Sequence, residues 1–163
     1  MHLVFALCQW LEQTTVGTAV RESKWLFPSL ETIHHLGIVS LIAATTMLDL
    51  RLMGLAMRRD PFSQVARRLL PYVWGGFGTN VLTGFLLFSS MAVRMYDNPA
   101  FRMKMLLIFL AGVNALVFEV TLYRGVAKWD DAPVTPIGAK AVGSCSLVLW
   151  LGVVSMGRWI GFE

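Results

Sequence analysis

Two adjacent histidines, His34 and His35, are the side chains of this sequence best suited to bind a cofactor or a metal ion. A neutral imidazole ligates haem iron or copper, and a neighbouring acceptor commonly orients its second ring nitrogen. Glu31 precedes the two histidines by three and four residues, which places it on the same side of a helix. His34 and His35 are therefore our candidate cofactor-binding and metal-binding residues. The alternative is that they are structural histidines that only make hydrogen bonds.

Three methionines are expected at the same depth as these histidines. A rise of 1.5 Å per residue puts His34, Met91, Met105 and Met156 roughly 6 Å from the ends of their apolar segments. Thioethers suit Cu(I) or the sixth position of a haem iron, so the three methionines are candidate metal ligands. The sequence contains nine methionines, and in an apolar chain most of them serve as packing material.

A haem held by two histidines of this one chain is not expected. The third histidine, His2, lies in an N-terminal segment that is too polar to cross a membrane. Haem b would instead need His34 or His35 together with a methionine, a five-coordinate iron, a ligand from His2, or a histidine from a partner chain.

A second layer of polar residues is expected near the opposite ends of the apolar segments. It contains Asp49, Arg51, Glu119 and Lys140. Charged groups inside a membrane are costly, and they are usually paired or functional. We interpret Asp49, Arg51 and Glu119 as a structural salt-bridge network. Proton transfer through one of the acids, or helix ends that leave these groups in water, are the alternatives. Lys140 is expected to extend its side chain toward the interface.

The elements that must position these side chains are membrane helices. The chain has 163 residues, of which 56% are hydrophobic and 15% are charged, against roughly a quarter charged in a globular protein. A soluble domain of this size has too much surface for so few polar groups. The mean hydropathy of +0.61 predicts an integral membrane protein, and the composition excludes a nucleic-acid-binding module. We attribute the net charge of +4 to topology and lipid headgroups.

Four segments are apolar enough to cross the hydrocarbon core, which takes about 20 residues in a helix. Backbone groups in lipid must be satisfied within the segment, which demands helices in this chain. We predict an all-α fold with a single membrane domain over residues 1–163. Residues 1–25 are expected to form an amphipathic helix in the interface. The expected four-transmembrane-helix up-and-down bundle has spans at about 30–54, 71–95, 101–124 and 136–160.

Spacing also predicts which side chains share a helical face, because each residue turns by about 100°. We expect the faces that carry the unusual polar, sulfur and glycine residues to line the interior of the bundle. The predicted interior faces are Asn80, Gly84 and Met91 on the second span, Met105, Gly112 and Glu119 on the third, and Cys145, Gly152 and Met156 on the fourth.

The distribution of Lys and Arg predicts the orientation of the chain. The loop after the first span and the segment that follows it carry clustered arginines, which favour the cytoplasmic side. They are Arg58, Arg59, Arg67 and Arg68. Both termini are therefore expected on the outer face, which is the periplasmic side if the protein lies in a bacterial inner membrane.

The sequence contains five short motifs: Pro28-x-x-Glu31-x-x-His34, Leu36-Gly37, Asp49-Leu50-Arg51-Leu52-Met53-Gly54, Thr83-Gly84-Phe85-Leu86-Leu87-Phe88 and Asn98-Pro99-x-Phe101-x-x-Lys104. These motifs resemble those of an uncharacterised bacterial family of four-helix membrane proteins, a domain of unknown function. The resemblance covers most of residues 25–119. The family is similar in outline to copper-resistance-D-type proteins and to four-helix membrane cytochromes b, and this similarity implies a haem or copper role for His34.

Three functional hypotheses follow. The first is a small non-catalytic subunit of a larger membrane complex, which holds haem b near the outer face through His34 and takes part in electron transfer. The second is a copper-handling protein that uses His34 or His35 with Met91, Met105 and Met156. The third is a cofactor-free accessory subunit that packs against other membrane subunits or another copy.

Catalysis by the chain alone is not expected, because its sequence lacks nucleophile–base pairs, phosphate-binding glycine loops and CxxC pairs. The expected partners are the lipid bilayer and other membrane protein subunits, or a second copy of the chain. Nucleic acid is not an expected partner.

Overall fold

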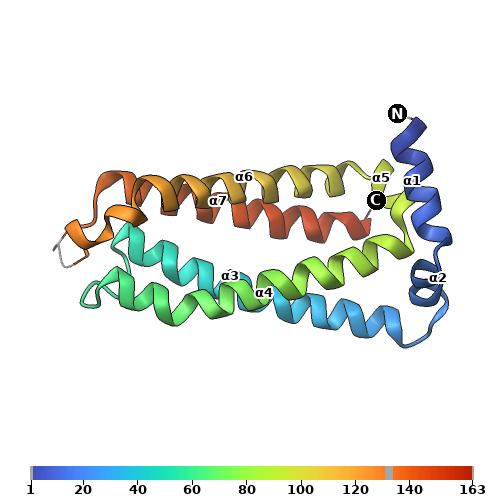
Figure 1. The fold of residues 1–163 in the computed structure, drawn as a ribbon, viewed down its shortest axis with the longest axis horizontal. Coiled ribbons are helices and arrows are strands. Elements are labelled where there is room, and N and C mark those ends of the chain that lie inside the picture. Colours follow the sequence, from blue (N-terminus) through green and yellow to red (C-terminus); the bar gives the residue numbers. More distant parts are fainter. Residues whose placement is uncertain (1, 131–133, 163) are drawn as a thin grey trace.

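This computed structural model describes residues 2–130 and 134–162, which contain nine helical elements joined by short loops (Figure 1). The described residues contain no strand, in agreement with the all-α prediction. In chain order the elements are α1 (His2–Gln13), α2 (Thr15–Glu22), α3 (Leu26–Met53), α4 (Phe62–Ser90), α5 (Ala92–Asp97), α6 (Pro99–Thr121), the 3-10 helix η1 (Tyr123–Lys128), α7 (Ile137–Trp159) and the 3-10 helix η2 (Ile160–Phe162).

Four long helices, α3, α4, α6 and α7, lie side by side, each antiparallel to the long helix before it (Figure 1). α3 packs against both α4 and α7, and α6 packs against α7. α4 and α6 meet through aromatic rings at their two ends. Phe88 stacks on Phe101 with ring centroids 5.4 Å apart at one end, and Phe62 contacts Phe118 at 5.6 Å at the other.

Three of the long helices are long and apolar enough to cross a membrane. They are α3, α6, and α7 together with η2. They support the prediction of a membrane protein. α4 is long, with 29 residues, but it is less apolar because glycines, threonines and Asn80 interrupt its sequence. Much of this polar side lies against α3. A Cβ atom added to Gly76 would lie 2.8 Å from the Gly37 carbonyl oxygen of α3, and Thr83 is buried.

The helix boundaries differ from our expectation mainly in α4. We expected the second span to begin at Pro71, but the helix begins nine residues earlier and Pro71 lies inside it. An internal proline removes one backbone donor and strains the preceding turn, yet the helix continues through it. The helix ends at Met91, whose φ of −148° and ψ of 39° are not helical. Residues 92–97, which we placed largely in the second span, form the separate helix α5.

The N-terminal segment forms two helices that lie across one end of the bundle, beside both termini (Figure 1). The helix is interrupted at Thr14, whose hydroxyl accepts a hydrogen bond from the Gly17 N–H at 3.2 Å and caps α2. A Cβ atom added to Gly17 would lie 2.7 Å from the Ser89 carbonyl oxygen, so α2 lies directly against α4. Glu12 accepts a hydrogen bond of 2.9 Å from the Val93 N–H. The segment is therefore a docked pair of helices and not the single helix that we predicted.

An aromatic-lined core holds the opposite end of the bundle. Leu52, Phe62, Ala66 and Ala139 are buried together there. The ring of Phe62 lies 5.6 Å from that of Trp129, and burial of such a ring contributes about 1.5–3 kcal/mol. Helices α3, α4 and α7 are thus fixed to one another, and to the segment after η1, at this end.

Candidate ligand-binding site around His34

His34 lies on α3 with its side chain half-buried and makes a hydrogen bond to α4. Its Nδ1 atom is 2.8 Å from the hydroxyl of Thr83, which is only 5% exposed. The same hydroxyl is 2.6 Å from the Thr79 carbonyl oxygen. A threonine hydroxyl has one hydrogen, and the carbonyl can only accept, so that hydrogen is given to Thr79. We infer that His34 Nδ1 carries a hydrogen and donates it to Thr83.

The consequence is that Nε2 of a neutral His34 carries a lone pair. A neutral imidazole holds one ring hydrogen, and the hydrogen bond made by one nitrogen determines which nitrogen is left to act as a ligand. The Thr79–Thr83 pair therefore presets the tautomer that can bind a metal through Nε2.

Glycines bring α3 and α4 close together around this imidazole. A Cβ atom added to Gly84 would lie 3.2 Å from Cε1 of His34, which is tighter than ordinary contact. One turn away, a Cβ on Gly37 would lie 2.9 Å from Nδ2 of Asn80. Asn80 donates to the Gly76 carbonyl oxygen at 2.8 Å, but its Oδ1 atom is buried without a partner. The site therefore contains a free polar acceptor near the imidazole, and such groups are uncommon in buried positions.

Lys104 of α6 is a cation close to this site, and our sequence analysis did not name it as a site residue. Its side chain is half-buried and lies within electrostatic range of His34. Its Nζ atom is 3.5 Å from the position of a Cβ on Gly157 of α7. A larger residue at position 157 would crowd the ammonium group. Among the residues that the structure describes, Lys104 makes no ion pair, so it is available to an anionic ligand.

The interior face of α6 differs from the one that we predicted. We expected Met105, Gly112 and Glu119 to line the bundle, but Met105 is 49% exposed, Glu119 is exposed and a Cβ on Gly112 would meet open space. The inward face instead follows the i, i+3, i+7 spacing of Lys104, Leu107 and Ala111. Leu107 contacts the Gly152 position of α7, and Ala111 is 7% exposed. The spacing of these three residues is visible in the sequence, although we did not predict this face.

The other candidate ligands have different surroundings, and their convergence on a common ligand with His34 stays a prediction. His35 is exposed, and its Nδ1 atom is 2.7 Å from the backbone carbonyl oxygen of Glu31. The imidazole of His34 is oriented by Thr83 and not by the carboxylate of Glu31. Met91 and Met156 are half-buried at the same end of the bundle.

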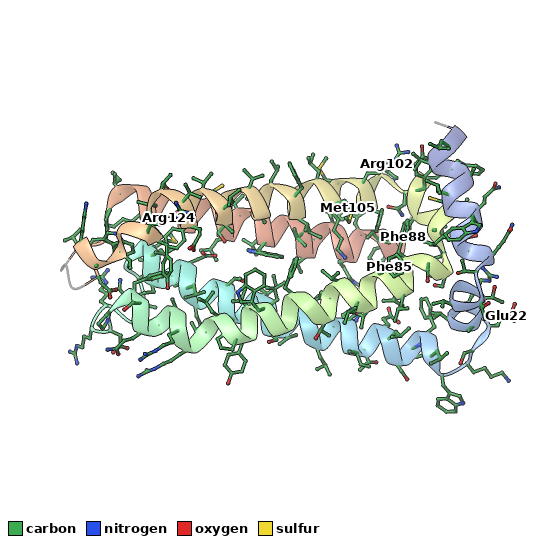
Figure 2. All side chains as sticks on the ribbon, in the orientation of Figure 1. Glu22, Phe85, Phe88, Arg102, Met105 and Arg124 are labelled. Carbon is green, nitrogen blue, oxygen red and sulfur yellow. The ribbon has the colours of Figure 1, made fainter. Side chains whose placement is uncertain are left out.

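Large side chains of α4 and α6 lie in the same half of the bundle as His34. Figure 2 shows Phe85 and Phe88 of α4, with Met105 and Arg102 of α6, in the half nearer α1 and α2. Among residues 2–130 and 134–162, no group of three His, Cys, Asp or Glu side chains is arranged to hold a metal ion. The side chain of His2 lies outside the described part of the chain.

The polar residues near the opposite end do not form the predicted ion-pair network in the described part of the chain. Arg51 is buried, and it donates to the Asp60 carbonyl oxygen at 3.0 Å and to the Thr135 hydroxyl at 3.4 Å. Glu119 faces outward. Asp49 is 6% exposed, and its Oδ2 atom has no hydrogen-bond partner. The two hydrogen bonds of Arg51 connect the end of α3 to the loops that contain Asp60 and Thr135.

Asp49 and Lys140 have separate surroundings. Asp49 lies where α3 meets α7, because a Cβ on Gly143 would be 3.0 Å from its carbonyl oxygen. Ser146 of α7 is the polar side chain that reaches the Asp49 carboxyl group. Lys140 is half-buried, and the expected extension of its side chain to the interface stays a prediction.

The chain matches the family of unknown function DUF6644 over residues 7–163. No curated protein and no solved structure matches it. The match confirms the expected membership of an uncharacterised family, and it covers more of the chain than the resemblance over residues 25–119. The similarity to copper-resistance-D-type proteins and to four-helix cytochromes b stays a prediction.

Proposed function

Because this chain belongs to the DUF6644 family, a family of unknown function, we propose a function from the chain's own geometry. It is a small non-catalytic membrane subunit that holds haem b through the Nε2 atom of His34, near the end of the bundle covered by α1 and α2. The hydrogen bond from His34 to Thr83 carries the proposal, because it leaves that nitrogen free to ligate iron.

Three features around His34 suit an iron porphyrin. Gly84 leaves space beside the imidazole where a Cβ would crowd it. Asn80 offers a buried acceptor that has no partner among residues 2–130 and 134–162. Lys104 supplies a cation without an ion pair among the described residues, and the carboxylates of haem need such a cation. When bound, haem supplies one-electron transfer, while the chain's residues orient the imidazole, balance the carboxylate charge and exclude water.

His34 is the only imidazole that we propose as an iron ligand from this chain. His35 is exposed and bonded to its own helix. Met91 and Met156, which are half-buried at the same end, stay candidates for a second ligand. The copper alternative needs Met105 as well, and its exposed position makes that set of ligands the weaker proposal.

We also propose that α4 crosses the membrane, which gives the four spans of the predicted bundle. α3 ends at the end of the bundle away from the termini, whereas α6 begins at the end beside them (Figure 1). If α3 and α6 both cross, the chain between them must cross back, and α4 is the long helix that connects them. At 1.5 Å per residue its 29 residues extend for about 43 Å, more than the roughly 30 Å of the hydrocarbon core.

The proposed location is a bacterial inner membrane with both termini on the periplasmic side. The clustered arginines at the far end of the bundle support this orientation. In this arrangement the His34 site lies near the outer face. The proposed partners are other membrane subunits of a redox complex, to which a one-haem subunit would pass electrons.

The test is an absorption spectrum of the full-length protein purified in detergent, recorded as reduced minus oxidised. We expect Soret and alpha bands of a b-type haem in the parent protein and in His35→Ala, and their loss in His34→Ala. Thr83→Val keeps the side-chain shape but removes the acceptor for Nδ1, so it should weaken haem binding by about tenfold or more. A parent protein without haem bands overturns the proposal, and copper found by elemental analysis would then favour the copper-handling alternative. Equal haem content in the two histidine variants overturns the role of His34.

A further inference from the structure

A shallow cavity of about 370 Å³, open to the outside of the protein, lies at the end of the bundle opposite His34. It is formed between the first turns of α4 and the start of η1. Its lining residues are Ser63, Gln64, Arg67, Leu70 and Tyr123. The haem proposal uses none of these residues, so the cavity is a separate feature.

The cavity lies beside the end of a helix that is apolar enough to cross a membrane, which is where we expect lipid headgroups. Tyr123 lies two residues after Thr121, the last residue of α6, and α6 is apolar enough to cross a membrane. Ser63 lies in the first turn of α4, and Leu70 lies about 10 Å further along the same helix at 1.5 Å per residue. The lining is thus polar toward the end of the bundle and apolar toward its middle. A phospholipid has the same order of groups, with its phosphate above its acyl chains.

The charge of this end favours an anionic group. Arg67 is exposed, and its guanidinium has no hydrogen-bond partner among the described residues. The acid at the rim, Asp130, is already engaged, because its carboxylate accepts hydrogen bonds from the N–H of Ser63 at 2.9 Å and from its hydroxyl at 2.5 Å. Further exposed cations lie at this end of the bundle, including Arg124 on η1, the residue after Tyr123 (Figure 2).

Three of the lining residues carry side-chain donors that could reach a ligand in this cavity. They are the guanidinium of Arg67, the amide of Gln64 and the hydroxyl of Tyr123. Arginine makes paired, charge-assisted hydrogen bonds to phosphate oxygens. Basic pockets at the ends of membrane helices are established binding places for anionic lipid headgroups. We propose that this cavity binds the phosphate group of an anionic membrane phospholipid. Arg67 is the main residue that contacts the phosphate, and Leu70 contacts the start of the acyl chains.

The test measures lipid retained by the full-length protein in native mass spectrometry after release from bilayers. The bilayers contain equal amounts of phosphatidylglycerol and phosphatidylcholine. We expect the parent protein to retain phosphatidylglycerol in preference, and Arg67→Gln to retain about tenfold less. The matched control is Arg68→Gln, which removes the same charge from the next position, is equally exposed and does not line the cavity. It should retain phosphatidylglycerol as the parent protein does.

Three results would overturn the inference. Equal loss in the Arg67 and Arg68 variants would mean attraction to the general surface charge. Equal retention of the two lipids by the parent protein would remove the requirement for an anionic headgroup. Displacement of bound phosphatidylglycerol by soluble glycerol 3-phosphate at the same concentration would mean that the site takes a free phosphate and not a lipid. Arg67 and Arg68 are both exposed, so both variants should fold, and equal melting temperatures would verify this.

Discussion

The hydroxyl of Thr83 does two things at once in this structure. It satisfies the Thr79 carbonyl oxygen inside α4, and it accepts the hydrogen of His34 from α3. A serine could make the same two bonds, but it would lose the methyl group that restricts the threonine side chain. The orientation of the proposed ligand therefore depends on a neighbouring helix more than on the residues beside His34 in sequence.

Cys8 allows a prediction about pH that is independent of the proposed function. It lies on the buried side of α1 with 6% of its surface exposed. Burial, and then the nearby carboxylates of Glu12 and Asp97, raise the pKa of the Cys8 thiol above its ordinary value of 9.0. Because the thiolate is the reactive form, we expect alkylation of Cys8 by iodoacetamide to be slow at neutral pH and to increase only above about pH 9.

The variant Glu12→Gln removes one of these negative charges and should shift the increase in alkylation to lower pH. The measurement uses Cys145→Ser, so that Cys8 is the single cysteine. The fold favours the neutral thiol, so the stability that Cys8 contributes is present below its ordinary pKa and is lost as the pH rises through the raised value. An alkylation rate that is already high at pH 8, and that increases no further at higher pH, would contradict the buried position of Cys8.

The residue types at the candidate site were predictable, but their contacts were not. His34 is conspicuous in sequence because histidine is rare in apolar helices. Its partner Thr83 is 49 positions away, and no local spacing connects them. Lys104 was not predicted as a site residue, because sequence gives the depth of a side chain more readily than its direction. Its neighbours at i+3 and i+7, Leu107 and Ala111, were the available signal.

At the level of helices, glycine determines how closely α3 and α4 approach. Gly76 and Gly75 are adjacent on α4, yet only Gly76 faces α3. A Cβ atom on Gly76 would lie 2.8 Å from Gly37 O and from the Leu41 amide nitrogen, whereas a Cβ on Gly75 would meet nothing within 4 Å. The atoms in conflict at Gly76 belong to the backbone of α3, so they cannot move aside as a side chain would.

We expect Gly76→Ala to destabilise the protein by about 1–3 kcal/mol, because the two helices must separate to admit the methyl group. Gly75→Ala is the matched control, since it adds the same methyl group to the same helix. It should leave stability unchanged or raise it by up to about 1 kcal/mol, as alanine favours the helix. Both values come from unfolding of the detergent-solubilised protein by SDS. Equal destabilisation by the two variants would contradict the close approach at Gly76.

Helix existence was easier to predict than helix ends. The apolar length of α3, α6 and α7 determined their positions to within a few residues. The start of α4 was missed because the segment 62–70 is polar on its exposed side and apolar only where Phe62, Val65 and Ala66 are buried. That burial depends on contacts with other elements, which sequence spacing does not reveal. The break at Thr14 is a local cap, and its side chain was the available signal.

At the scale of the whole molecule, the two ends of the bundle have different chemistry. One end is covered by α1 and α2 and holds His34 and Lys104. The other holds the aromatic core around Phe62, the exposed arginines and the cavity at Arg67. At 1.5 Å per residue, Thr83 at the His34 site and Arg67 at the cavity lie about 24 Å apart along α4. The two sites would lie toward opposite sides of the membrane if all four long helices cross it.

The crossing of α4 can be tested with cysteines placed beyond its two ends. Arg59→Cys lies in the loop before α4, and Arg94→Cys lies on α5 after it; both positions are exposed. Each is made in a chain with Cys8→Ser and Cys145→Ser. On intact spheroplasts a membrane-impermeant maleimide should label Arg94→Cys at once and Arg59→Cys only after permeabilisation. Lys24→Cys is the control for the outer side, since it precedes α3 at the same end of the bundle as α5.

The possible outcomes separate the number of crossings from their direction. Labelling of both positions, or of neither, before permeabilisation would place the two ends of α4 on one side and contradict four spans. Labelling of Arg59→Cys alone would keep the four spans but reverse the orientation, because the arginine-rich end would then face outward. Membrane helices usually orient with their basic ends toward the cytoplasm. The reversed result would mean that the arginines at this end do not determine the orientation of the chain and instead contact protein or lipid.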